Sequence, residues 1–252
     1  MLFQLLRGPC WSVRPLLGCK HMPTSLPKHQ RLKMTQSEHR QKFIRIGIIT
    51  ITAVYLLILV GGIVRASGAG MGCPDWPTCF GQLIPPTSES QLPSDYHERY
   101  IGYGDTTFNP LKTWTEYLNR LLGVSIGFLI LATLIRSLPF RKFAPAVTGY
   151  STGIFLLVGF QGWLGSRVVA SELKPILISA HMLVAFLIVS LLIYTVCLAG
   201  NSWLKKQSFG TVSPRWRNVL RIAIALTLIQ IAMGTQIREA IDGITNAHVM
   251  PD

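Results

Sequence analysis

The sequence has few charged residues, and acidic residues are the scarcest among them. Only 14% of its 252 residues are charged, with 11 Asp and Glu against 24 Lys and Arg, whereas 49% are hydrophobic. Soluble globular domains carry about 25% charged residues, so this composition argues against a soluble fold. The distribution of the apolar residues is therefore the first feature to interpret.

The apolar residues gather into five runs along the chain. About 20 apolar residues in a helix cross the roughly 30 Å of hydrocarbon in a bilayer. The runs are Ile46–Val64, Leu121–Ile135, Val147–Val169, Ile176–Leu198 and Val219–Ile237. The second run reaches spanning length only if Trp114–Arg120 joins its helix. The pattern predicts an all-α polytopic membrane protein with five spans.

The net charge of +13 is distributed by side of the membrane. Residues 1–45 contain nine Lys and Arg and one acid. In the connections after the second and fourth runs, all the charged residues are basic. Residues 66–113 contain five acids against two basic residues. This is the positive-inside pattern, which places the N-terminus in the cytoplasm or the mitochondrial matrix. The basic charge therefore indicates topology and does not indicate a nucleic-acid partner.

The first 36 residues contain no acid and six basic residues. That composition is typical of a mitochondrial targeting segment. The alternative is a wrongly assigned start, with the protein beginning at Met34. In either case we predict that residues 1–41 are a disordered leader outside the fold.

Two of the five cysteines, Cys73 and Cys79, lie in "GCPDWPTCF" on the face predicted to be external. That face permits disulfides both in bacteria and in the mitochondrial intermembrane space. The two prolines between the cysteines can bend the loop back, so we predict a Cys73–Cys79 disulfide. Two free thiols, a metal site and an exposed redox-active disulfide are the alternatives.

Polar residues inside the predicted spans are costly and are functional candidates. Glu116, Asn119 and Arg120 lie on one helix face of "TEYLNRLLG", and Gly123 continues that face inward as part of a G-x-x-x-G pattern typical of close helix packing. His181 lies six residues after Pro175, about 9 Å into its helix at 1.5 Å per residue. A buried imidazole of this kind is either a haem iron ligand or a histidine hydrogen-bonded to the backbone.

The first and fifth runs end alike, in "GGIVRAS" and "GTQIREA". Each places an arginine four residues after a glycine, where the guanidinium can reach the interface. This echo suggests that the fifth run begins a second bundle that the chain does not finish. We therefore predict a four-helix transmembrane bundle over residues 42–200, and the first helix of an incomplete second bundle over residues 201–252.

The segments "GGIVRASGAGMGCPDWPTCFGQLIPPT", "FNPLKTWTEYLNRLLG", "GFQGWLGSRVVAS" and "AHMLVAF" together resemble the haem A synthase family, also called the cytochrome oxidase assembly family. The resemblance runs from about Lys42 to Asp242. It implies an enzyme of two similar four-helix bundles, which oxidises the C8 methyl of haem O to the formyl of haem A for cytochrome c oxidase. The first bundle takes the substrate haem and the second holds a haem b cofactor.

The resemblance assigns roles to individual residues. His181 matches an iron ligand, and Cys73 and Cys79 match the paired loop cysteines. Glu116 matches an acid near the reacting methyl, which would accept a proton or stabilise an electron-poor intermediate. Arg120 would pair with a haem propionate or with Glu116. The residues assigned to the haem pocket are Arg65, Asn119, Arg120, Gly123 and Arg167, and no other metal is expected.

Two departures from the family pattern leave catalysis open. The family motif Glu-x-x-His-Arg reads "EYLNR" here, so Asn119 stands where a second haem ligand belongs. If the chain is complete, we also expect the family's haem b site to be missing. The alternatives are therefore an oxidoreductase acting on haem O, or a non-catalytic haem-binding or assembly protein. The resemblance implies haem O synthase, cytochrome oxidase assembly factors, membrane lipid and a second copy of the chain as partners. It places the chain in a bacterial plasma membrane or the mitochondrial inner membrane.

Overall fold

The computed structural model describes residues 28–100, 108–200 and 213–249, and the predicted all-α architecture is confirmed there. The helices are α1 (Lys28–Ala66), the single turn α2 (Tyr96–Arg99), α3 (Pro110–Ser137), α4 (Pro145–Ala170), α5 (Pro175–Ala199) and α7 (Pro214–Val249), with short 3₁₀ turns η3 (Glu89–Gln91) and η4 (Leu138–Lys142). Four of these helical segments are long and apolar enough to cross a membrane, with Met34–Ala66, Pro110–Lys142, Pro145–Ala170 and Pro175–Ala199 as their bounds.

The helix starts follow from local sequence. α3, α4, α5 and α7 each begin with a proline, which suits the first helical turn because its fixed φ is helical and its missing N–H would have no partner there. Asn109 caps α3, since its side-chain oxygen accepts a hydrogen bond from the Lys112 N–H at 3.1 Å. α3 includes Trp114–Arg120, so the predicted lengthening of the second span is confirmed.

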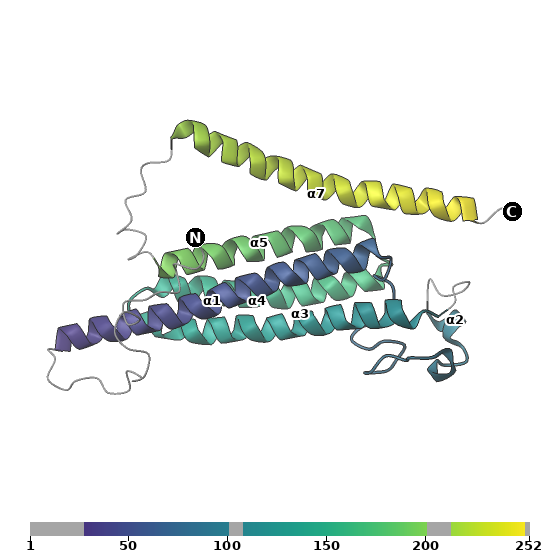
Figure 1. Ribbon diagram of the computed structural model, residues 1–252, viewed down its shortest axis with the longest axis horizontal. Helices are drawn as coiled ribbons and strands as arrows, with labels where there is room; N and C mark the ends of the chain where they lie inside the picture. The colour runs from purple at the N-terminus through teal and green to yellow at the C-terminus, as the bar shows by residue number, and fades with distance from the viewer. Residues whose placement is uncertain (1–27, 101–107, 201–212, 250–252) are drawn as a thin grey trace, which may run out of the picture.

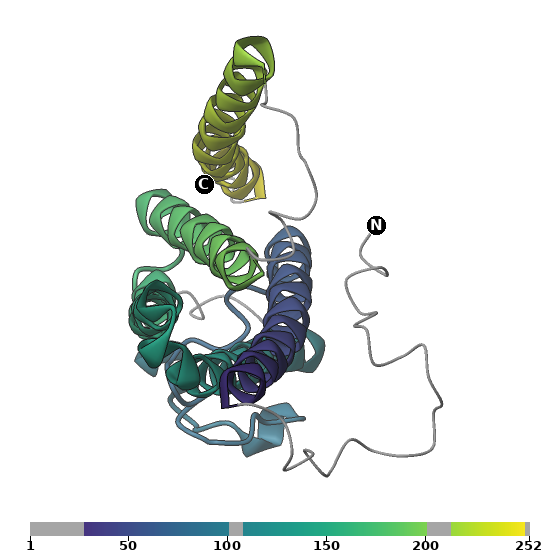
Figure 2. The same cartoon turned by 90° about the vertical axis from the view of Figure 1, so that its left-hand side faces the viewer.

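Four long helices form a closed bundle. α1 packs against α3 and α5, and α4 packs against the same two helices, so the four surround one core (Figures 1 and 2). That core includes Val54, Ile126, Ile154 and Leu192, one residue from each helix. α7 lies outside the four and contacts α5 (Figure 2).

The outward faces of the bundle are apolar as well. Leu59, Phe128 and Leu156 are each more than 60% exposed. Helices that are apolar on all sides suit a lipid environment, so the chain is an integral multi-pass membrane protein. Its orientation and its membrane stay predictions. The end of the bundle where α1 ends and α3 begins is named the loop end.

A layer of hydroxyl groups crosses the bundle near the opposite end. Thr50, Thr133, Ser151 and Thr195 come from α1, α3, α4 and α5 respectively, and each donates to the carbonyl oxygen four residues earlier in its own helix. The Thr50 and Thr133 hydroxyl oxygens also lie 2.9 Å apart, so one of the two can donate to the other in place of its own helix carbonyl. A cavity of about 10 Å³ beside this layer has room for one water molecule and is far too small for a porphyrin.

Three predictions about helix boundaries and packing can be compared with the structure. Residues 28–41, predicted as part of a disordered leader, are helical and extend α1, whereas residues 1–27 lie outside the described residues. The fifth apolar run lies in α7, which is not among the four spanning segments, so a fifth span stays a prediction. Close helix packing at Gly123 and Gly127 is wrong, because a Cβ at either glycine would meet no other atom within 4 Å.

Candidate functional site

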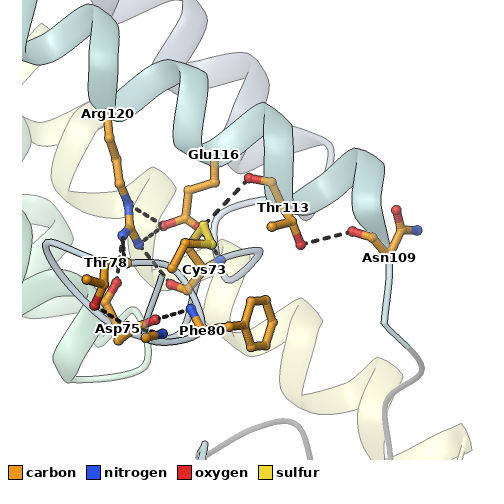
Figure 3. The surroundings of a disulfide bond; sticks show 10 residues. Cys73, Asp75, Thr78, Phe80, Asn109, Thr113, Glu116 and Arg120 are labelled. Atoms are coloured by element: carbon orange, nitrogen blue, oxygen red, sulfur yellow. Dashed lines mark hydrogen bonds and ion pairs between the residues drawn. A yellow bond between two sulfur atoms is a disulfide. The ribbon is translucent and has the colours of Figure 1, made fainter. Parts of the chain in front are cut away.

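Glu116 and Arg120 form a buried ion pair at the loop end of α3. Their side chains are 5% and 14% exposed, and the Arg120 Nε and Nη2 groups both donate to Glu116 Oε1, the first at 3.1 Å. The second carboxylate oxygen accepts the backbone N–H of Cys73 at 2.8 Å. The pair is one helical turn apart, which the sequence spacing allows, but its burial depends on the loop that covers it (Figure 3).

Arg120 also holds that loop through its backbone. Its Nη1 group donates to the carbonyl oxygens of Asp75 at 2.6 Å and Thr78 at 3.1 Å, and Nη2 donates to that of Cys73 at 2.8 Å. These carbonyl oxygens would otherwise have to find water, and a buried polar group without a partner is costly. Arg120 therefore acts as a clamp between α3 and residues 73–78 (Figure 3).

The predicted disulfide between Cys73 and Cys79 is present, and it is buried rather than exposed. Both cysteines are 0% exposed. The Cys73 sulfur lies 3.6 Å from the Thr113 carbonyl oxygen, which is a packing contact because a disulfide sulfur has no hydrogen to donate. The free-thiol alternative is wrong. A disulfide that reductants cannot reach in the folded state favours a structural role over the redox role considered from sequence.

The loop continues into a tight hairpin turn fixed by Asp75. Phe80 and Gly81 both have positive φ, the backbone pattern that a two-residue type I′ hairpin requires, and Cys79 and Gln82 exchange two backbone hydrogen bonds around them. The Asp75 carboxylate accepts from the Phe80 N–H at 2.6 Å, the Gly81 N–H at 2.8 Å and the Thr78 hydroxyl. This acid is therefore committed to loop structure and is not free for catalysis.

Gly72 allows the loop to touch α3. A Cβ at this position would lie 2.4 Å from the Lys112 carbonyl oxygen and 2.8 Å from the Thr113 backbone nitrogen. Backbone atoms in a helix cannot move aside cheaply, so only glycine fits here. The loop meets α3 directly at this point, one residue before the disulfide.

Replacing Gly72 by Ala is expected to separate the loop from α3 and to destabilise the protein by about 1–3 kcal/mol, as overpacking does. The measurements are thermal unfolding in detergent and the rate at which a reductant opens the disulfide, which should rise. Gly62→Ala is the matched control, because a Cβ at Gly62 meets nothing within 4 Å. Equal unfolding temperatures for the two variants would contradict the close contact.

His181 lies inside the bundle with an unused ring nitrogen. Its Nδ1 atom is buried and has no hydrogen-bond partner, and a Cβ on Gly165 of α4 would lie 3.4 Å from the neighbouring ring carbon. The Gln161 side chain donates to the His181 carbonyl oxygen at 2.9 Å, which ties α4 to α5 at this level. The sequence left two interpretations of His181, a haem iron ligand or a histidine hydrogen-bonded to the backbone. The structure shows no backbone hydrogen bond to Nδ1.

Asn119 is a second buried group with an unused atom. Its Oδ1 has no hydrogen-bond partner, and a Cβ on Gly61 of α1 would lie 3.9 Å from it. The Trp114 Nε1 and Gln161 Oε1 atoms are buried and unpartnered too. All four atoms belong to the half of the bundle nearer the loop end. Unpartnered polar atoms are uncommon in folded cores, so these four are candidates for contact with a ligand or water.

The remaining predicted site residues also lie toward the loop end. Arg65 and Arg167 belong to the last turns of α1 and α4, and the Arg167 side chain is exposed. Gly123 has open space beside its Cα. Within the described ranges, no group of three His, Cys, Asp or Glu could hold a metal ion, although a haem iron needs only one or two such ligands.

Sequence reasoning missed Gly72, Asp75, Gln161 and Gly165. The signal for Asp75 was its position before a Phe-Gly pair, because a short acid that accepts backbone N–H groups is typical of a tight turn. The other three depend on contacts between elements far apart in the chain, and no local pattern indicates them.

A family model described as cytochrome oxidase assembly protein matches residues 44–251. Proteins named Heme A synthase are similar to this chain. That of Shewanella oneidensis is 36% identical over 145 residues, 58% of this chain and 42% of the relative. That of Azorhizobium caulinodans is 30% identical over 198 residues, 72% and 54% respectively.

The protein named Heme A synthase from Sinorhizobium fredii is 26% identical over 226 residues, which cover 85% of this chain and 61% of the relative. The chain therefore spans about two-fifths to three-fifths of the length of these curated relatives. No solved structure matches the chain.

Proposed function

Because this chain belongs to the cytochrome oxidase assembly protein family, we propose that its four-helix bundle binds haem O and serves as the substrate half of a haem A synthase. The reaction proposed is oxidation of the C8 methyl of haem O to the formyl of haem A. Relatives named Heme A synthase support this substrate class.

The observation that carries the proposal is the buried, unpartnered Nδ1 atom of His181 beside Gly165. A neutral imidazole is a common axial ligand of haem iron. Glycine on the facing helix leaves room for the flat ring to turn, and the open space at Gly123 and Gly127 would admit part of a porphyrin edge. The donor set therefore fits one-sided coordination of a haem iron through His181.

Asn119 does not fit as the second ligand, because an amide is a poor donor to iron. Its unpartnered Oδ1 can instead accept a hydrogen bond from a polar group of the substrate or from water. One-sided ligation through His181 would leave the other face of the substrate iron without a ligand from this bundle.

The role of Glu116 changes once its contacts are known. Its carboxylate is held by Arg120 and by the Cys73 N–H, so we assign the pair to positioning the loop over the bundle. Arg120 has its donors on Glu116 and three loop carbonyls, and that geometry favours Glu116 over a propionate as its partner. A proton-accepting role for Glu116 requires the ion pair to open.

Asn119→His tests the pocket. Restoring a histidine at this position is expected to convert bound haem from five-coordinate high-spin to six-coordinate low-spin, because imidazole would occupy the open iron face. The measurement is the optical spectrum of the protein purified after co-expression with a haem O source. Asn119→Leu is the control and should leave the spin state unchanged. Haem that stays high-spin in Asn119→His would place residue 119 away from the iron.

A second candidate is a non-catalytic haem carrier or assembly protein of the same family. The commitment of Glu116 to the Arg120 clamp favours it, because among the described residues no acid makes a hydrogen bond or ion pair with the His181 ring. The haem recovered from the protein distinguishes the two candidates. Haem A recovered from the protein supports catalysis, whereas haem O or haem b alone supports the carrier.

A further inference from the structure

The membrane boundary on the loop side can be located from α1. Residues 46–64 carry no charge and are flanked by Arg45 and Arg65. The two arginines are separated by 20 positions, which at 1.5 Å per residue is about 30 Å, the thickness of the hydrocarbon core. Arg65 therefore marks the level at which α1 leaves the hydrocarbon.

α3 gives the same level independently. Its exposed Arg136 marks the opposite boundary, and a helix needs about 20 residues to cross the core, which places the loop-side boundary near Glu116. The helix extends a further six residues beyond Glu116, to Pro110. The Glu116–Arg120 ion pair thus lies at the boundary between lipid tails and headgroups.

The disulfide loop is held at this depth. Arg120 and Glu116 bind the backbone at residues 73, 75 and 78, and Gly72 touches α3 at Lys112 and Thr113. The loop therefore packs against the first turns of α3 (Figure 3). These contacts hold the loop backbone in place and therefore fix the directions of its exposed side chains.

Those outward side chains are large and apolar. Trp76 is 51% exposed in the disulfide loop, and Leu83 and Ile84, directly after the hairpin turn, are 76% and 69% exposed. Phe80, by contrast, points inward and packs edge-on against Tyr96, Tyr100 and Phe108. Within the described residues, Phe80 is therefore packed against other rings, whereas Trp76, Leu83 and Ile84 are exposed.

We propose that Trp76, Leu83 and Ile84 insert into the lipid interface on the loop side and anchor the disulfide loop to the membrane surface. Tryptophan is enriched at this level of membrane proteins because its ring is apolar and its N–H is polar. Two neighbouring aliphatic residues exposed to water would instead be unfavourable. The depth of the loop favours lipid over a partner protein, and the inference does not depend on the proposed haem chemistry.

The experiment places an environment-sensitive NBD label on single cysteines in the full chain. Cys10, Cys19 and the exposed Cys197 are first changed to Ser, which leaves the buried disulfide intact. Leu83→Cys and, in a second variant, Ile84→Cys carry the label. Ser88→Cys, an exposed polar position in the same loop region, is the matched control. The proteins are reconstituted in phosphatidylcholine vesicles and quenched by lipid-borne nitroxide or by aqueous iodide.

Labels at 83 and 84 are expected to be quenched several-fold more by nitroxide lipid, and several-fold less by iodide, than the label at 88. Iodide quenching at 83 and 84 equal to that at 88 would overturn the proposal, because the side chains would then be in water. Shielding of both positions from iodide and from nitroxide would also overturn it, in favour of burial against a second copy of the chain.

Discussion

Arg120→Met is expected to destabilise the protein more than any other single substitution at the loop end. The change leaves the Glu116 carboxylate buried without its cation and removes the donors to three loop carbonyl oxygens. Breaking a buried ion pair in this way typically costs about 3–5 kcal/mol. Thermal unfolding in detergent measures the loss, and faster reduction of Cys73–Cys79 reports release of the loop.

Two controls isolate the cause. Arg136→Met makes the same substitution at the other end of α3, where the side chain is exposed, and should change stability little. The double variant Glu116→Gln with Arg120→Met should be more stable than Arg120→Met alone, because no uncompensated charge remains buried. Arg120→Met that unfolds at the same temperature as Arg136→Met would show that the clamp contributes nothing.

His181→Ala is expected to lose most of its bound haem after co-expression with a haem O source. The proposed iron bond comes from this one side chain, and no other histidine belongs to the four spanning segments at that level of the bundle. The measurement is the haem-to-protein ratio of the purified sample. Met182→Ala removes a neighbouring, 41% exposed side chain on the same helix and should retain haem.

His181→Ala must keep its fold for that result to be interpreted. The substitution removes a ring that packs against Gly165 but no described side-chain hydrogen bond, so the unfolding temperature should change far less than in Arg120→Met. Full haem occupancy in a folded His181→Ala protein would remove His181 from the haem site.

The long helices could be predicted from sequence because each depends on local information. Apolar runs indicated the four spanning segments, and the prolines at 110, 145 and 175 mark where three of them start. The helical extension of α1 back to Lys28 could not be predicted in the same way, because residues 28–41 are polar and lack an apolar run.

The site was predicted in composition but not in arrangement. Glu116, Arg120 and the two cysteines were recognised, yet the sequence could not show that Arg120 reaches across more than 40 positions to three carbonyl groups. Such contacts depend on how the loop backbone folds, and backbone carbonyls have no sequence signature. The same reason explains why no local pattern indicated that Gly165 lies beside the His181 ring.

Binding of a haem O-type substrate through His181 is the basis of the proposed function. The most direct test is to purify the full chain after co-expression with a haem O source, extract its haem and identify it by chromatography and mass. Haem O or haem A is expected in the wild-type protein and neither in His181→Ala. A folded wild-type protein that carries no haem, or only haem b that persists in His181→Ala, would contradict it.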